Sequence, residues 1–219
     1  MRERPTILLT GFGAFPGVPV NATTALVPRV EEAAREMFPS HAVIGEILPV
    51  HWEDAPTRLK TLIDRENIAL VLHLGVSESA EGFQLELVGR NRQIPREDIS
   101  GSLPRTAHVI ETGPDILATT LPVERIAARL LGCGYPCKTS DDAGSYLCNT
   151  LLYHSLTAAW DQPEPYLAGF IHVPAALTGH GGDGLQAHPD SPIDWKAAVS
   201  GTLEIISACV DHLAEQKGR

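Results

Sequence analysis

Cysteine is scarce in this sequence, and its scarcity argues against two classes of protein. Only four cysteines occur in 219 residues, and their spacing does not form a disulfide framework. Cys133 and Cys137 are four positions apart, but no second pair of Cys or His follows them at the spacing of zinc ligands. We therefore expect neither a disulfide-stabilised secreted domain nor a structural metal site.

Positive charge is also in short supply. The 17 Lys and Arg residues face 27 Asp and Glu residues, which gives a formal net charge of −10. This sign disfavours nucleic acid and anionic membranes as partners. No apolar run reaches the roughly 18 residues that a membrane-spanning helix requires. The short apolar stretch near the N-terminus is interrupted at once by the glycines of residues 11–17, which a signal peptide would not have there. We expect a single cytoplasmic domain spanning residues 1–219.

The sequence does contain a regular alternation of apolar runs and helical periods. Apolar runs predict strands at residues 6–10, 42–50, 69–74, 83–88, 138–140 and 168–173. Helical spacing predicts helices at 21–37, 53–66, 123–131, after 142 and at 199–213, the first of them kinked by Pro28. Residues 91–118 and 174–190 are predicted to be long loops. Strands alternating with helices indicate an α/β protein with a mainly parallel sheet covered on both faces.

A glycine-rich turn, GFGAFPG, follows the first predicted strand. Gly11 and Gly13 match the start of a dinucleotide-binding fingerprint, but Pro16 stands where that fingerprint needs its third glycine. Phe12 and Phe15 are either core residues or the walls of a ligand site, because α/β proteins bind ligands at the carboxyl ends of their strands.

Three further residues together have the chemistry of nucleophilic catalysis. Cys148 is predicted to lie in the first turn of a helix, where the helix dipole favours a nucleophilic thiolate. His172 closes the apolar strand AGFIHV, and Glu86 lies in a strand whose alternation places it on one face with Gln84. Each of the three has an alternative structural role, as a buried cysteine, a core histidine and a solvent-facing carboxylate. Together they supply a nucleophile, a base and an orienting group.

The order of these motifs resembles pyroglutamyl peptidase type I, the pyrrolidone-carboxylate peptidase family of cysteine peptidases. The resemblance runs from about residue 6 to the last helix. It is carried by TGFGAF at 10–15, Asn21 before a helix, EILPV at 46–50, LGVSES at 74–79, QLELVGRN at 84–91, DAGSYLCN at 142–149 and FIHVP at 170–174. The resemblance implies a three-layer α/β/α sandwich with a mainly parallel mixed sheet and phosphorylase/hydrolase-like topology.

The resemblance also implies a function and a site. It implies an exopeptidase that removes an N-terminal pyroglutamyl residue from peptides through an acyl-enzyme, without a metal or organic cofactor. Because bacterial members of the family are often tetramers, it also implies a homo-oligomer, with a homotetramer as the expected form. The implied nucleophile is Cys148, the base is His172 and the third member of the triad is Glu86. The implied substrate-binding residues are Phe12, Phe15 and Asn21.

The chain departs from the family pattern after Glu86. It has Glu86-Leu-Val-Gly-Arg-Asn91 where many bacterial members have Glu-Arg-Val-Ala-x-Asn, and its residues 93–97 replace the usual Arg-Ile-Pro-Asp-Asn. The resemblance implies that the latter stretch gives a backbone N–H to the oxyanion, and Gln93 is the matching position here. The backbone N–H of Cys148 is expected to be a second donor to the oxyanion.

Two other functions fit the sequence. One is a non-catalytic α/β module that binds a nucleotide or nucleoside through residues 11–17 and the glycines of 179–184. The other is a divergent thiol amidohydrolase that takes a different small acyl group. A binding module needs neither Cys148 nor His172, so dependence of activity on the thiol separates it from the peptidase.

Overall fold

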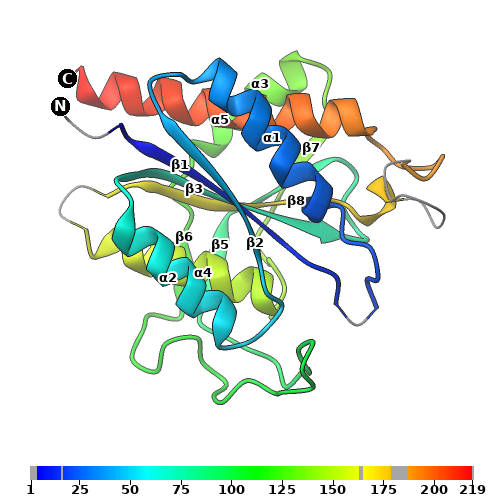
Figure 1. Ribbon diagram of the computed structural model, residues 1–219, viewed down its shortest axis with the longest axis vertical. Helices are drawn as coiled ribbons and strands as arrows, with labels where there is room; N and C mark the ends of the chain where they lie inside the picture. The colour runs from blue at the N-terminus through cyan, green and yellow to red at the C-terminus, as the bar shows by residue number, and fades with distance from the viewer. Residues whose placement is uncertain (1–3, 16, 163–164, 179–186, 219) are drawn as a thin grey trace.

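The computed structural model describes residues 4–15, 17–162, 165–178 and 187–218, and its centre is a mixed six-stranded sheet (Figure 1). The strand order is β2-β1-β3-β8-β4-β7. The strands are β1 (Thr6–Phe12), β2 (Ala42–Leu48), β3 (Ile68–Ser77), β4 (Phe83–Glu86), β7 (Cys137–Ser140) and β8 (Leu167–Pro174). The first four strands in this order are parallel, β4 runs antiparallel to β8, and β7 is parallel to β4.

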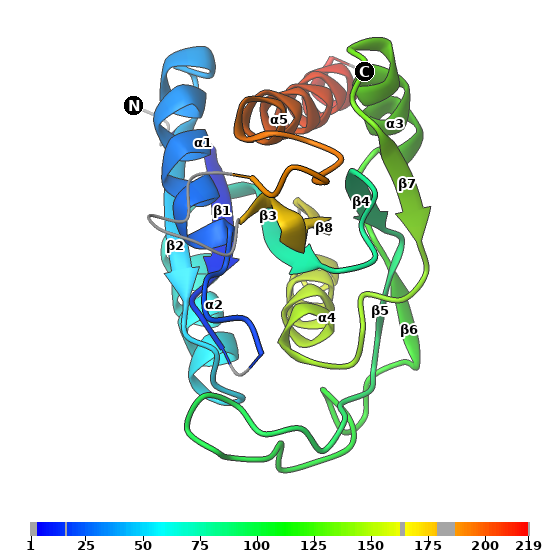
Figure 2. The ribbon, with the colours of Figure 1, turned by 90° about the vertical axis from the view of Figure 1, so that its right-hand side faces the viewer.

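Helices cover both faces of this sheet, as the turned view makes plain (Figure 2). One face carries α1 (Thr23–Met37), α3 (Val123–Gly132) and α5 (Trp195–Lys217), and the other carries α2 (Asp54–Arg65) and α4 (Leu147–Trp160). The predicted three-layer α/β/α fold with a mainly parallel mixed sheet is therefore confirmed.

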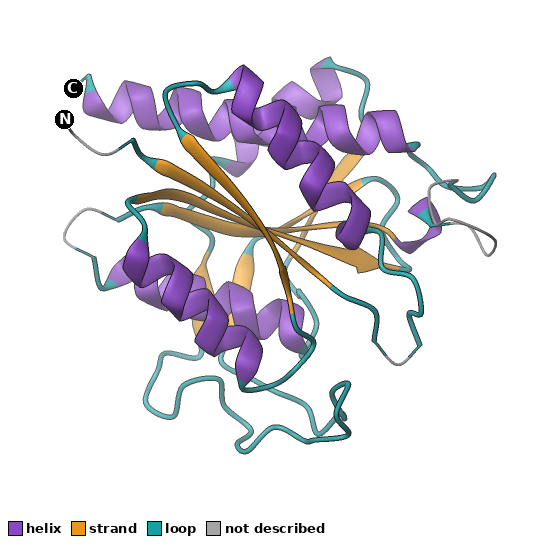
Figure 3. Cartoon of the chain, viewed as in Figure 1, coloured by secondary structure: helices purple, strands orange, loops and turns teal. Residues whose placement is uncertain are grey.

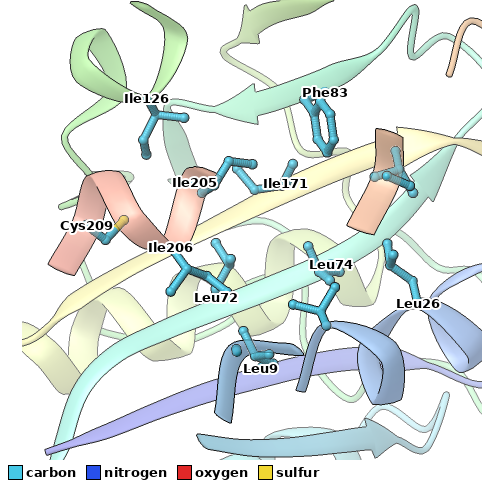
Figure 4. Close-up of a cluster of buried hydrophobic side chains, with 14 of the residues drawn as sticks. Leu9, Leu26, Leu72, Leu74, Phe83, Ile126, Ile171, Ile205, Ile206 and Cys209 are labelled. Atoms are coloured by element: carbon cyan, nitrogen blue, oxygen red, sulfur yellow. The ribbon is translucent and has the colours of Figure 1, made fainter. Parts of the chain in front are cut away.

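Each sheet face has its own apolar core. The core under α1, α3 and α5 includes Leu72, Phe83, Ile171 and Ile205, all fully buried (Figure 4). The core under α2 and α4 includes Leu8, Phe12 and Phe170. Successive residues of a strand point to opposite faces, so β8 gives Ile171 to the first core and Phe170 to the second. Strands buried on both faces explain why β1 and β8 are almost continuously apolar.

The structure corrects two details of the sequence prediction. The predicted strand 83–88 divides at Leu87, whose N–H donates to Ser140 and whose carbonyl accepts from Thr119. The chain then continues as β5 (Val88–Arg90), which pairs antiparallel with β6 (Ile116–Ala118) in a separate two-stranded sheet. The predicted loop 91–118 therefore ends in a strand. Only residues 91–115 form the irregular excursion at the lower edge of Figure 3.

The remaining elements follow the prediction closely. Pro28 lies inside α1, which continues through it to Met37. In the predicted loop 174–190, Ala175–Leu177 form a 3-10 turn, and the prediction for residues 179–186 lies outside the described residues. Helix α5 has the length and composition of a membrane span, but the buried core helix of a globular domain meets the same two criteria. Here it packs over the sheet between α1 and α3 (Figure 2).

Candidate active site

Strand pairing brings the carboxylate and the imidazole of the predicted triad together. In the antiparallel pair of β4 and β8, Gln84 lies directly opposite His172. Residues opposite each other share a sheet face, and Glu86, two positions further along β4, shares it too. Gly75 pairs with His172 from the other side, and a Cβ there would lie 2.7 Å from the ring of Phe170 and 3.1 Å from His172 Cδ2. This close approach explains the glycine.

Glu86 and His172 form a buried ion pair. The Nδ1 atom of His172 donates to Glu86 Oε1 at 2.7 Å, and the two residues are only 5% and 1% exposed. Because Nδ1 faces the carboxylate, Nε2 is the ring nitrogen that remains for a reacting group. The sequence left open whether Glu86 faces solvent or a buried imidazole, and the structure shows the latter.

Cys148 is the second residue of α4 and is half-buried. Its sulfur lies close enough to His172 to raise the pKa of that imidazole. Asn149, the next residue, anchors the start of the helix: its Oδ1 accepts from Arg90 N at 2.8 Å, and its Nδ2 donates to Arg90 O at 2.8 Å and to Arg92 O at 3.0 Å. The helix thus presents Cys148 to the imidazole from a fixed start.

Opposing effects decide the ionisation of the buried pair. Burial disfavours a charged imidazole, but the hydrogen bonds and negative charges of Cys148 and Glu86 outweigh it and raise the pKa of His172 to about 9. Burial also disfavours a charged carboxylate. The hydrogen bonds and charge of His172, with help from Gln84, nevertheless hold the pKa of Glu86 below its ordinary value. At neutral pH this site holds an imidazolium beside a carboxylate.

A small pocket opens beside the thiol. Its lining is Phe12, Phe15, Asn21, Val50, Val76, Tyr146, Leu147 and Cys148. The three predicted substrate-binding residues, Phe12, Phe15 and Asn21, are therefore gathered next to the predicted nucleophile. The cavity has a volume of about 20 Å³, which is room for roughly one water molecule. A larger acyl group needs more room than this cavity encloses, and half-buried Phe15 lies on the loop before α1.

The outer wall of this pocket has no signal in the sequence. The Arg96 guanidinium lies over the ring of Tyr146, 4.8 Å from its centroid, and 5.9 Å from that of Phe15. Trp52 meets Tyr146 edge-on and donates from Nε1 to the Arg96 carbonyl at 2.8 Å. These contacts join residues far apart in irregular segments, and hydrophobic periodicity carries no signal for them.

Two of the predicted site residues are engaged in hydrogen bonds within the protein. The amide of Asn21 is used within the protein: Nδ2 donates to Gly13 O at 3.2 Å, and Oδ1 accepts from the N–H and the hydroxyl of Thr23. Asn21 therefore shapes the loop that carries Phe15. The N–H of Gln93 donates to Ala107 O at 2.8 Å, so the prediction that it stabilises an oxyanion is not supported.

The structure also contains a hollow of about 280 Å³ between α2 and α4, lined in part by Lys60, Asp64, His154 and Asp161. It includes no member of the triad. Within the described ranges, no three His, Cys, Asp or Glu side chains gather as metal ligands.

A thiol at a helix start, an imidazole beside it and a carboxylate that holds the imidazole form the constellation of a cysteine peptidase. Here the constellation lies on one face of an α/β sheet beside a small, mainly apolar pocket. Comparison with known proteins then identifies the family.

The family model for pyroglutamyl peptidase matches residues 5–199. A pyrrolidone-carboxylate peptidase from Oceanobacillus iheyensis is 31% identical over 205 residues, which cover 94% of this chain and 98% of that protein. The pyrrolidone carboxyl peptidase structure from Thermococcus litoralis superposes with a TM-score of 0.84 at 25% identity, covering 97% of this chain and 96% of that one. The chain belongs to the pyroglutamyl peptidase family.

Proposed function

We propose that this protein removes the N-terminal pyroglutamyl residue from peptides, with Cys148 as nucleophile, His172 as acid and base, and Glu86 as the group that orients the imidazole. One observation carries the assignment of the triad: Glu86 holds His172 at Nδ1 at 2.7 Å, and Cys148 is near enough to help raise the pKa of the same imidazole. Membership of the family supports the substrate.

Acylation begins when the Cys148 thiolate attacks the carbonyl carbon between pyroglutamate and the next residue. The carbonyl oxygen gains the electron pair, and the N–H of Cys148 is placed to stabilise it. First-turn N–H groups of a helix have no partner within the helix and point toward developing negative charge. The C–N bond then breaks, and His172 gives its proton to the leaving amine.

Deacylation uses the same imidazole in reverse. Neutral His172 takes a proton from water, which attacks the thioester and releases free pyroglutamate and the thiolate. Glu86 stabilises the imidazolium in both steps and holds its Nδ1–H in place.

The pocket supports a neutral, flat acyl group. None of its described lining residues is an acid or a base that could pair with a cationic ligand, apart from the nucleophile Cys148. The lactam of pyroglutamate carries no charge and can bury its ring faces against Phe12 and Phe15. A prolyl N-terminus has a similar ring with a cationic amine, which costs several kcal/mol to bury without a partner.

The test is the release of a fluorophore from pyroglutamyl, prolyl and glutaminyl amides by the wild type and by Cys148→Ala. We expect turnover of the pyroglutamyl amide, its nearly complete loss in Cys148→Ala, and discrimination over the prolyl amide on the order of 10⁴-fold. Undiminished activity in Cys148→Ala contradicts the cysteine mechanism. Equal rates on the pyroglutamyl and prolyl amides contradict the lactam pocket, and preference for another acyl group favours a divergent amidohydrolase.

We further propose that the enzyme works in the cytoplasm as a homo-oligomer, the tetramer being the assembly that the family resemblance implies. All four cysteines are unpaired, which suits a reducing compartment. Trp160 and Leu131 are 78% and 61% exposed, and assembly would cover such apolar side chains. Sedimentation velocity should give four times the chain mass, and a monomer at all concentrations contradicts the assembly. Cell fractionation tests the location.

A further inference from the structure

Gln84 lies beside the proposed triad and has no role in the mechanism described so far. Its side chain is 6% exposed, and its Nε2 donates to Glu86 Oε1 at 2.7 Å. The same oxygen accepts from His172 Nδ1 at 2.7 Å. One carboxylate oxygen therefore receives two short hydrogen bonds, one from the imidazole and one from an amide that is always neutral.

Strand pairing sets the backbone position of Gln84, as it does for Glu86 and His172. Gln84 pairs with His172 across the β4–β8 ladder, and Glu86 pairs with Ser140 on β7. Three groups therefore face the Glu86 carboxylate: Gln84 on the same strand, His172 on β8 and the neutral Ser140 on β7. Cys148 on α4 interacts with His172 and so affects Glu86 only indirectly. Gln84 is an uncharged donor among them, so it favours the ionised carboxylate at every pH of interest.

We propose that Gln84 is a positioning residue of the catalytic site: its amide holds the Glu86 carboxylate ionised and oriented toward His172, and so acts on the Cys148–His172 pair without touching substrate. This inference rests on the proposed triad and extends it by a fourth member.

A residue that acts through Glu86 should affect chemistry more than binding. Without the amide donor, Glu86 is easier to protonate and freer to rotate, because burial opposes its charge. Protonated Glu86 no longer supports an imidazolium, so the reactive thiolate–imidazolium pair becomes less populated on the acidic side of the pH profile. Gln84 does not line the pocket formed by Phe12, Phe15 and Tyr146, so we expect its replacement to leave substrate contacts there unchanged.

The experiment compares Gln84→Met with Leu85→Met. Methionine approximates glutamine in length but cannot donate, and Leu85 is the next residue of the same strand, buried in the opposite core. We expect kcat of Gln84→Met to fall by roughly tenfold while KM stays within about twofold. The acidic limb of kcat/KM should move up by roughly half to one pH unit. Leu85→Met should keep the wild-type limb.

A second measurement needs no substrate. The rate of iodoacetamide modification of Cys148, followed by mass spectrometry across the same pH range, should show the same upward shift of the acidic limb in Gln84→Met. If the wild type does not hydrolyse a pyroglutamyl amide, the proposed function fails, but this measurement still decides the role of Gln84.

The proposal is overturned if Gln84→Met keeps the wild-type kcat and both acidic limbs. It is equally overturned if the variant only melts at a lower temperature, with unchanged activity per folded molecule, because a structural role would do that. Should Gln84→Met fail to fold, Gln84→Asn keeps a buried amide but withdraws it from Glu86 by one methylene. Gln84→Asn should then shift the acidic limb of the kcat/KM profile to higher pH, as expected for Gln84→Met. An acidic limb at the wild-type pH in this variant would contradict the proposal.

Discussion

Two buried histidines lie against the same phenylalanine but differ in protonation state. The ring of His73 on β3 stacks on Phe170 with centroids 5.8 Å apart, and the ring of His172 on β8 is tilted against Phe170 with centroids 4.6 Å apart. Burial lowers the pKa of His73 to about 3, whereas the pKa of His172 is raised to about 9. At neutral pH one imidazole is neutral and the other is an imidazolium.

Their hydrogen-bond partners explain the difference. His73 lies between two hydroxyls, with 2.6 Å from Nδ1 to Thr10 Oγ1 and 2.6 Å from Nε2 to Ser155 Oγ. A hydroxyl can donate or accept, so it satisfies a neutral ring and adds no charge to stabilise a proton. His172 instead faces the carboxylate of Glu86 and the sulfur of Cys148, whose negative charges offset the cost of burial. Burial disfavours charge at both sites, and the partners decide the outcome.

The first and largest test of this comparison is activity. Replacing His172 by Ala removes the acid and base, and kcat/KM should fall by about 10³- to 10⁴-fold, as for the base of other triads. His73→Leu should keep most of the activity of each folded molecule, because the hydrogen-bond partners of His73 are two hydroxyls outside the proposed triad. Turnover of a pyroglutamyl amide, normalised to folded protein by circular dichroism, measures both. Comparable losses in the two variants would contradict the separation of roles.

The second test removes the charge that separates the two histidines. Glu86→Gln keeps the shape of the side chain but not its negative charge, so the pKa of His172 should fall. We expect kcat to drop by about 10²-fold and the alkaline limb of kcat/KM to move to lower pH, because the imidazolium loses its proton earlier. A pH–rate profile checks this expectation. An alkaline limb that stays in place would show that Cys148 alone sustains the imidazolium.

The comparison also shows what the sequence can and cannot predict. Motif order pointed to Cys148, His172 and Glu86, which the structure brings together. Strand alternation predicted the shared face of Gln84 and Glu86, because a period of two fixes that face. The role of His73 had no such signal. Its partners Thr10 and Ser155 lie 63 and 82 positions away, and the strand around it is simply apolar.

The irregular segment 91–115 was the least predictable part of the molecule. The engagement of the Gln93 N–H by Ala107 and the stacking of Arg96 on Tyr146 depend on loop backbone geometry, which has no periodic pattern. The fold class and the strands were predictable because buried parallel strands impose long apolar runs. The division of one predicted strand into β4 and β5 was not predictable from the sequence, because both halves have an extended backbone.

The third test uses stability, where the two histidines should have opposite pH dependence. His73 has a lowered pKa in the folded state, so its contribution is full above pH 6.5 and is lost as pH falls toward 3. His172 has a raised pKa, so its contribution is full below pH 6.5 and is lost as pH rises through about 9.

Urea unfolding of the wild type, His73→Leu and His172→Gln between pH 4.5 and 9.5 measures these contributions as differences. At pH 8 the His73→Leu variant should be less stable by about 2 kcal/mol, because two buried hydroxyls lose their partner. The loss in the free energy of unfolding caused by His73→Leu should become smaller as the pH is lowered. The loss caused by His172→Gln should become smaller as the pH is raised. Parallel trends in the two variants would contradict the assigned charge states.

The last and smallest test concerns the shared ring of Phe170. An imidazolium whose centroid lies 4.6 Å from an aromatic ring gains a cation–π attraction, and a neutral imidazole gains little. Phe170→Leu should therefore lower the pKa of His172 and move the alkaline limb of kcat/KM down by about half a unit. The matched control is Phe83→Leu, an equal truncation of a fully buried ring in the opposite core. Both variants should lose stability from the cavity they create, but only Phe170→Leu should shift the limb. If the alkaline limb stays at the wild-type pH in both variants, the ring of Phe170 does not contribute to the different protonation states of the two histidines. Their hydrogen-bond partners alone then set their charge.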